Sequence, residues 1–325
     1  MKKHVLFFGM LSICLTHNGQ NYRQYYQIVD SAYYFWKTGE NLRSDSLYQK
    51  AFSLFTGFPY DYTNAAYNIY SIDKSKGNIY LGQAFKYGQH IGNVKFILKK
   101  DSVDYNSGEL RKIARKNKEK TLKGVKKGKI RRIFFKDQIP RQFASKKIDR
   151  NDSINFYKII NMMENDSLIF NRFYTGYNHN VLWGLLLTHV SYNIEHYKKI
   201  APYYIRFIEK GWIERESFVD NIDVITALCG YMIEIDEKTG TIIELPEKNR
   251  YIIENKLYYS LSGDLSFYFS SLGGQVTVPV HPDMSAEEVD AFRRSIFLGP
   301  YEMYKKSRPY KYYPTEEEFK NLFKK

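Results

Sequence analysis

Small and aromatic residues alternate at helical spacing in the first third of the chain. Between residues 22 and 100 the same order occurs twice: an amphipathic stretch, a turn with a glycine, and a second amphipathic stretch. Residues three or four apart share one face of a helix, so each copy predicts two helices that pack together. The key positions are Ala32, Phe35, Trp36, Gly39, Tyr48, Ala51, Phe52 and Phe55, then Ala65, Ala66, Ile69, Tyr70, Gly77, Tyr80, Ala84 and Phe85.

The apolar pattern after residue 130 predicts further helices. Asp149 and Asp152 are both candidates for the N-cap of one helix, because a short acidic side chain accepts hydrogen bonds from the first turn. A second helix is predicted over residues 180–194. Pro202 fits the first turn of a third, where its missing N–H is not needed. Residues 214–231 predict a fourth, with one apolar face.

Strand signals are confined to two short stretches. Alternating β-branched residues predict strands at 241–245 and 275–280. Ser285 and Glu288 have the spacing of a capping box and predict a last helix. The segment 307–325, rich in tyrosine and lysine, is predicted to be a frayed tail. The predicted fold class is therefore mainly α, with helical hairpins followed by a helical domain with a small β element.

The spacing of small and aromatic residues in the first helical region is similar to that of a known helical repeat. Residues 21–105 resemble the tetratricopeptide repeat, in which antiparallel helix pairs interlock small residues with large ones. An ordinary pair of helical hairpins is the alternative. Two repeats are fewer than such arrays need for stability, so this region is expected to pack against the part of the chain that follows. The resemblance implies a packing role first and ligand binding second.

Charge is concentrated in a single internal segment. The chain has 49 Lys and Arg against 35 Asp and Glu, a net charge of +14, yet residues 111–136 alone hold 13 of the cations against Glu119. Residues 106–135 therefore predict a basic helical connector. It is either a solvated spacer or a contact for an anionic surface through 111–136. No aromatic residue interleaves the lysines as single-strand binding requires, so nucleic acid is not an expected partner.

The first twenty residues have the order of an export signal. Lys2 and Lys3 precede the apolar run 5–15 and a polar stretch to residue 20, which is typical of a secretory signal peptide. A buried strand is the alternative. Cys14 raises lipid anchoring as a second fate, although the bulky residue before it fits poorly. Cys229, in an apolar helical context, is expected to behave as a small hydrophobe. No later stretch is long enough to cross a membrane, so the mature protein is expected in the periplasm or outside the cell.

Polar residues recur inside apolar stretches in the second part of the chain. They are Asp137, Gln138 and Arg141, then Asp152 and Asn155, His189, Gly274 and Gln275, and finally Val289, Asp290, Arg293 and Arg294. Taken in order, they are similar to an uncharacterised family of bacterial domains of unknown function, over about residues 130–305. That family opens with Asp-Gln-x-x-Arg and ends with Val-Asp-x-x-Arg-Arg. The resemblance implies an architecture and no established reaction.

These residue types permit one kind of chemistry. General acid–base catalysis by His189, oriented by Asp137 or Asp223, is compatible with them, and Arg141 or Arg294 would then hold an anion. Motifs for zinc, phosphate loops and nucleophile elbows are absent from the sequence, so no metal or cofactor is expected. The alternative is a buried Asp, Arg and His network that joins helices. The residues assigned to binding are Arg141, Gln138, Asn155, Gln275, Arg293 and Arg294.

Together these patterns predict an exported, two-part helical protein. Its divisions are residues 1–20, a signal peptide; 21–105, tetratricopeptide-like helices; 106–135, the connector; 136–306, a helical domain; and 307–325, a tail. The expected function is a binding or scaffolding module of the bacterial envelope, with another envelope protein or a peptide as partner. The alternative is a hydrolase-type enzyme with its Asp, His and Arg site in the C-terminal domain.

Overall fold

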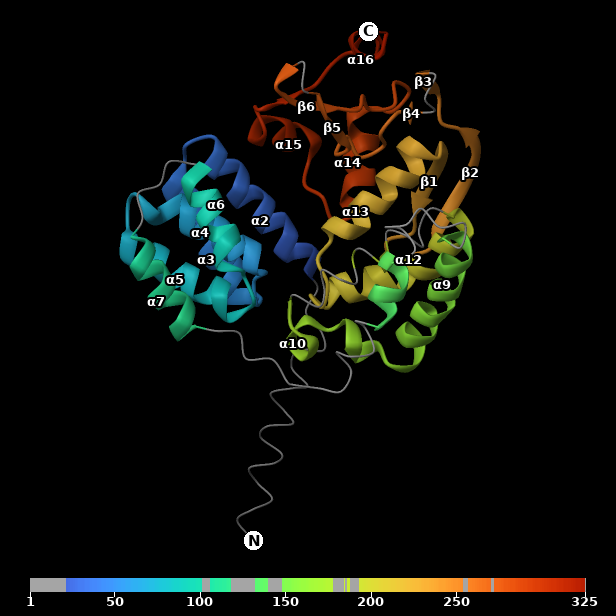
Figure 1. The fold of residues 1–325 in the computed structure, drawn as a ribbon. Helices are drawn as coiled ribbons and strands as arrows, with labels where there is room; N and C mark the ends of the chain where they lie inside the picture. The colour runs from blue at the N-terminus through green and yellow to red at the C-terminus, as the bar shows by residue number, and fades with distance from the viewer. Residues whose placement is uncertain are drawn as a thin grey trace.

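The computed structural model describes residues 22–100, 106–117, 132–139, 148–177, 184, 186–187, 193–253, 257–269 and 272–324. It is mainly helical with small β-sheets, as predicted (Figure 1). The signal peptide, Cys14, Arg141 and His189 lie outside the described residues, as does most of the helix predicted over 180–194. None of the described helices has the length and apolar character that crossing a membrane requires.

The N-terminal region consists of consecutive helices joined by short turns. Ala32, Ala51, Ala65 and Ala84 are fully buried where neighbouring helices meet, because a methyl side chain lets large rings approach the opposing backbone. Gly39 adopts φ +87° in the first turn, a conformation that favours glycine. The predicted helices are thus present. Their bounds are α2 Tyr22–Lys37, α3 Asn41–Leu54, α4 Pro59–Tyr70, α5 Lys74–Lys86 and α6 Ile91–Lys100.

The basic segment begins as part of this array. Helix α7, Ser107–Lys116, is capped by Asn106, whose side chain accepts from the backbone N–H groups of the first turn. Leu110 is buried against the array, and the Glu109 carboxylate accepts a 2.7 Å hydrogen bond from Asn78 of α5. Residues 106–117 of the predicted connector therefore belong to the helical array, while 118–131 lie outside the described residues.

The helices of the C-terminal region differ from prediction at their ends. Helix α9 begins at Ile148, so Asp149 and Asp152 lie inside it and neither is its N-cap. Asn193 caps α12, so Pro202 lies in mid-helix, because the apolar stripe from residue 194 onward outweighs the one hydrogen bond that proline removes. The bounds are α9 Ile148–Asn165, η2 Ser167–Phe170, α10 Arg172–Thr175, α12 Ile194–Glu209, α13 Glu216–Asp223 and the π-turn η3 Val224–Leu228.

Strands are more numerous than the pattern predicted. The helix predicted to reach residue 231 ends at the π-turn, Gly230 turns the chain with φ +78°, and a strand follows. The described residues form three small sheets, which are β1 with β2, β3 with β4, and the mixed sheet β5-β6-β7. The strand bounds are β1 Tyr231–Ile235, β2 Ile242–Lys248, β3 Tyr251–Ile253, β4 Leu257–Tyr258, β5 Ser266–Phe269, β6 Gly274–Thr277 and β7 Lys311–Tyr312.

The last helices include the predicted capping box and an ordered C-terminus. Ser285 and Glu288 cap α14, Ala286–Ser295, and α15, Tyr301–Ser307, follows it. The prediction of a frayed tail is wrong. Strand β7 pairs in parallel with β6, and α16, Glu316–Leu322, begins at a second capping box. Phe319 is 0% exposed in a small apolar cluster with β3, β4 and β6, so burial of one ring holds the tail in place.

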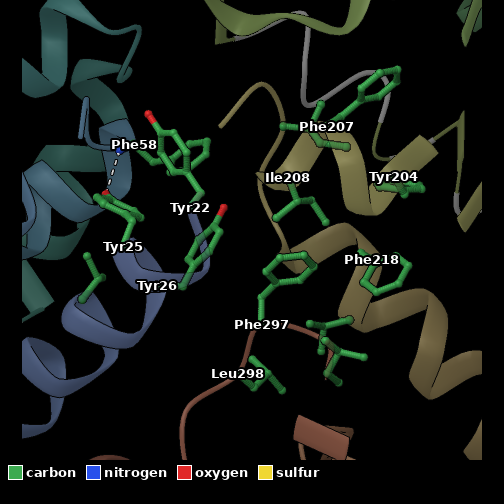
Figure 2. Packing of buried hydrophobic residues seen from close by; sticks show 14 of the residues in the cluster. Tyr22, Tyr25, Tyr26, Phe58, Tyr204, Phe207, Ile208, Phe218, Phe297 and Leu298 are labelled. Atoms are coloured by element: carbon green, nitrogen blue, oxygen red, sulfur yellow. Dashed lines mark hydrogen bonds between the residues drawn. The ribbon is translucent and has the colours of Figure 1, made fainter. Parts of the chain in front are cut away.

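One hydrophobic core joins the N-terminal helices to the C-terminal region. Figure 2 shows Phe297 between Tyr26 of α2 and Phe218 of α13, with ring centroids 6.1 and 6.5 Å away. Buried Arg172 reinforces this contact: its guanidinium donates to the carbonyls of Gly211 at 2.8 Å, Gly57 at 2.8 Å and Thr56 at 2.7 Å. The described parts of the two halves therefore pack directly against each other.

Candidate binding site between the two halves

An ion pair anchors α2 to the C-terminal region. The guanidinium of Arg215, at the start of α13, binds both carboxylate oxygens of Asp30, one of them at 2.9 Å from Nη1. The backbone N–H of Gly299 donates to Asp30 at 2.8 Å, and Arg215 also donates to the carbonyl of Phe297. A fork-shaped cation and a carboxylate match well in this two-contact geometry. Asp30 is thereby fixed at the boundary of the two halves.

Beside this pair lies a pocket of about 100 Å³, which we call the seam pocket. The Asp30–Arg215 pair forms one wall, and α13, the loop at Asp264, the end of α14 and the helix α15 form the rest. In Figure 1, α2 faces α13 and α15 across this boundary. The side chains that matter for its chemistry are Asp220, Asp264, Arg293, Met303, Tyr304 and Arg308.

Arg293 is the most buried charge of the seam pocket, at 1% exposed. Its Nε donates to the carbonyl of Gly299 at 2.6 Å and its Nη1 to the carbonyl of Ser262. The rings of Tyr301 and Tyr304 lie 5.7 and 4.8 Å from the guanidinium carbon. Burial lowers the pKa of Arg293, and Asp264 opposes that effect. Among the described residues, however, no carboxylate oxygen is within ion-pair distance of Arg293.

Tyr304 contacts two further cations, of which Arg308 lines the pocket and Lys311 does not. The guanidinium carbon of Arg308 lies 4.0 Å from the centre of its ring, and Lys311 Nζ donates to its hydroxyl at 2.6 Å. Burial lowers the pKa of Lys311, an effect that Asp264 opposes. Arg308 also donates to the Ser307 hydroxyl at 3.3 Å but forms no ion pair within the described part of the chain. Asp264 favours the charged forms of Arg308 and Lys311, so one nearby carboxylate offsets part of this positive charge without forming an ion pair among the described residues.

Asp220 and Asp264 supply negative charge at the same pocket. Burial and the nearby Asp264 raise the pKa of the Asp220 carboxyl to about 6. Neither carboxylate forms an ion pair with any described cation. Since unlike charges face one pocket without pairing, its walls can hold both an anionic and a cationic group of one ligand.

Behind the pocket, Asp223 is buried in a serine-lined site. Ser262 Oγ donates to Asp223 at 2.6 Å and Ser260 Oγ at 3.4 Å. Burial raises the pKa of Asp223 to about 8, and Asp264 adds to the effect while Ser262 opposes it. The backbone carbonyl of Ser262 accepts from Arg293, so two predicted site residues meet through this serine. Ser262 is fully buried, which excludes it from contact with a substrate in this conformation.

The other predicted site residues lie in different places. Asp137 is buried and accepts hydrogen bonds from Gln138 at 2.7 Å and from Asn155 at 3.3 Å, across the contact of 132–139 with α9. This arrangement joins two helices. Arg294 is exposed on α14, and its carbonyl accepts from Arg23 of α2.

The remaining two positions lie at the surface. Gln275 is exposed on β6. Cys229 is exposed at the end of the π-turn, so the expectation of a buried thiol is wrong. The π-turn shifts the helical register by one residue and turns the thiol outward. Within the described ranges, no three His, Cys, Asp or Glu side chains gather as metal ligands would.

Several residues that line the seam pocket are not predicted from the sequence. Arg293 is among the predicted site residues, whereas Asp30, Asp264 and Arg308 are not. Asp30 and Arg308 belong to segments predicted as a repeat helix and a frayed tail, and nearly the whole chain separates them. Only a charged residue on an apolar helix, such as Asp30 within α2, offered a local signal.

Comparisons with known proteins identify no counterpart. No protein-family model, no curated protein and no solved structure matches the chain. The likeness of residues 130–305 to a family of unknown function and that of residues 21–105 to tetratricopeptide repeats therefore stay predictions from the sequence.

Proposed function

We propose that this chain is a binding module of the bacterial envelope and that it holds its ligand in the seam pocket. The observation that carries the proposal is Arg293, a nearly fully buried cation that lines the pocket with no ion-pair partner among the described residues. The export signal predicted for residues 1–20 supports the location.

The energetic cost of burying charge supports a ligand at this place. An arginine removed from water without an opposite charge costs several kcal/mol, which backbone carbonyls and aromatic rings offset only in part. Asp264 compensates Arg293 and Arg308 in part, and a ligand that brings a carboxylate to both arginines would add a direct ion pair. Perturbed and unpaired charges around one cavity are typical of functional sites.

Hydrolysis is less well supported by the described residues. A general base must reach the proton that it removes, whereas Asp223 is buried behind Ser262, and Asp137 is occupied by Gln138 and Asn155. The two carboxyl groups were the alternative partners expected for His189, and each has polar partners of its own. Binding without bond cleavage is thus the simpler function for this arrangement.

Photo-crosslinking tests whether the seam pocket is occupied. A benzophenone amino acid replaces Met303, which lines the pocket, in the full chain produced in bacterial cells. The matched control carries it at Lys306, on the exposed face of the same helix. After irradiation, mass spectrometry should find an adduct at position 303 and none at 306. Equal labelling at both positions, or no adduct at 303, would refute a ligand in the seam pocket.

A further inference from the structure

We infer that the seam pocket binds a small zwitterion, a molecule that carries a carboxylate and an ammonium group on one short framework, as a free amino acid does. This inference rests on the proposed binding function and names its ligand class. It is drawn from the charges that line the pocket, from their pairing and from the size of the cavity.

The carboxylate end fits the arginine side of the pocket. Arg293 and Arg308 both line it, and both lie against the ring of Tyr304, at 4.8 and 4.0 Å from its centre. Guanidinium groups recognise carboxylates through paired hydrogen bonds, and an aromatic ring holds the guanidinium plane in position. Two N–H donors of Arg293 are used by backbone carbonyls, which fixes its orientation and leaves others for a ligand.

The ammonium end fits the acidic side. Asp220 and Asp264 line the same cavity, and neither has a cationic partner among the residues that the structure describes. An ammonium group carries three donors and needs acceptors around it, which two carboxylates provide. Asp264 is also close to the hydroxyl of Tyr304, so the two ends of the site meet at this tyrosine.

The balance of charge disfavours ligands of a single sign. Asp30 binds Arg215, and the Glu216 carboxylate lies 3.6 Å from the same guanidinium, so the charge of Arg215 is already matched and one negative charge is left over in this group. Two arginines and two aspartates then remain at the pocket. Inorganic phosphate would face both aspartates, and a simple amine would face both arginines. A ligand with both charges meets an opposite charge both at the arginines and at the aspartates that line the pocket.

The cavity volume restricts the rest of the ligand. About 100 Å³ holds only a few water molecules, so the framework between the two charged groups must be short. Amino acids with small side chains, such as glycine, alanine and serine, fit this limit best. A dipeptide carries the same two charged groups on a longer framework. Comparing it with an amino acid therefore distinguishes a peptide from a free amino acid as the ligand.

Isothermal titration calorimetry on the full chain tests the ligand class. Alanine, dialanine, acetate, methylamine and inorganic phosphate are titrated separately at low salt. We expect alanine to bind at least tenfold more tightly than acetate or methylamine, with no binding of phosphate. Preference for dialanine over alanine would assign the zwitterion to a peptide. Binding of phosphate without alanine would overturn the inference in favour of an anion site.

Two variants and one control locate the binding. Asp220→Asn, at the exposed rim, and Arg308→Met should each weaken alanine binding at least tenfold. Arg206→Met is the matched control, since Arg206 also lies near a tyrosine ring, at 5.8 Å from Tyr203, but outside the pocket. Its affinity should equal that of the parent. If Arg308→Met fails to fold by circular dichroism, Asp220→Asn decides the outcome alone, and unchanged affinity in that variant refutes the site.

The two proposals fail separately. If no zwitterion binds while the crosslink at Met303 persists, the ligand class is wrong and the binding function stands. If alanine does not bind and no adduct forms at Met303, both are wrong.

Discussion

Removing the guanidinium of Arg172 should destabilise the whole protein. Arg172→Met retains an apolar stem of similar length, so the change removes the donors and little volume. In the parent, Arg172 donates to three backbone carbonyls from two loops, those of Thr56 and Gly57 and that of Gly211. The guanidinium carbon also lies 3.8 Å from the centre of the Phe58 ring. The variant loses all of these contacts at once.

The structure gives the size of the effect. Thr56 keeps a donor, because the hydroxyl of Tyr22 binds its carbonyl at 2.9 Å. Gly57 and Gly211 each lose the Arg172 donor in a buried environment, at about 1 to 3 kcal/mol per acceptor. The lost contact with Phe58 adds about 1 kcal/mol. The total is about 3 to 7 kcal/mol, a large fraction of the 5 to 15 kcal/mol that stabilises a typical domain.

Urea unfolding followed by circular dichroism measures this loss. Arg250→Met is the control, since Arg250 is 57% exposed and pairs with Asp283 at the surface. Exposed ion pairs contribute less than about 1 kcal/mol, so the control should unfold close to the parent. A loss below about 1 kcal/mol for Arg172→Met, or one equal to the control, would refute the claim that these carbonyls depend on the guanidinium.

Three further changes test other parts of the structure. Because the folded chain raises the pKa of Asp223 to about 8, it binds that proton more tightly than the unfolded chain. The free energy of unfolding should therefore fall by up to about 5 kcal/mol from pH 4 to 8, and Asp223→Asn should flatten this decline in urea titrations at each pH. Gly211→Ala should cost about 1 to 3 kcal/mol in thermal unfolding, since φ is +63° and a Cβ would overlap Tyr22; an unchanged midpoint would contradict this. Phe319→Ala should make the segment after residue 307 sensitive to limited proteolysis, and parent-like resistance would contradict its anchoring role.

Local signals predicted local structure well. The capping box of Ser285 and Glu288 lies where the sequence places it, because its hydrogen bonds join residues three apart. The paired helices of the first region follow from alternating small and aromatic residues for the same reason. The prediction that Pro202 lies in the first turn of a helix is wrong, because proline is enriched at helix starts only on average. Asn193 caps this helix upstream of Pro202.

The seam pocket could not be predicted from local sequence signals. Asp30 and Gly299 are far apart in sequence, and their 2.8 Å hydrogen bond exists only because α2 packs on the C-terminal region. Short strands such as β4 and β7, with two residues each, carry too few positions for an alternating pattern. Arg293 is predicted from a resemblance, whereas only the folded chain shows that no described carboxylate lies within ion-pair distance of its guanidinium.

The parallel pairing of β7 with β6 and the contact of α2 with α15 have a consequence for biosynthesis. Tyr26 and Asp30 near the start of the chain receive Phe297 and Gly299 as neighbours only when almost the entire chain has left the ribosome. Aromatic rings of the first helices therefore stay exposed until the C-terminal segment is synthesised. Contacts between segments so distant in sequence also form slowly. If the chain is exported, it would cross the membrane before these contacts form. A C-terminal truncation would therefore remove packing partners of α2, the first helix, as well as the deleted residues.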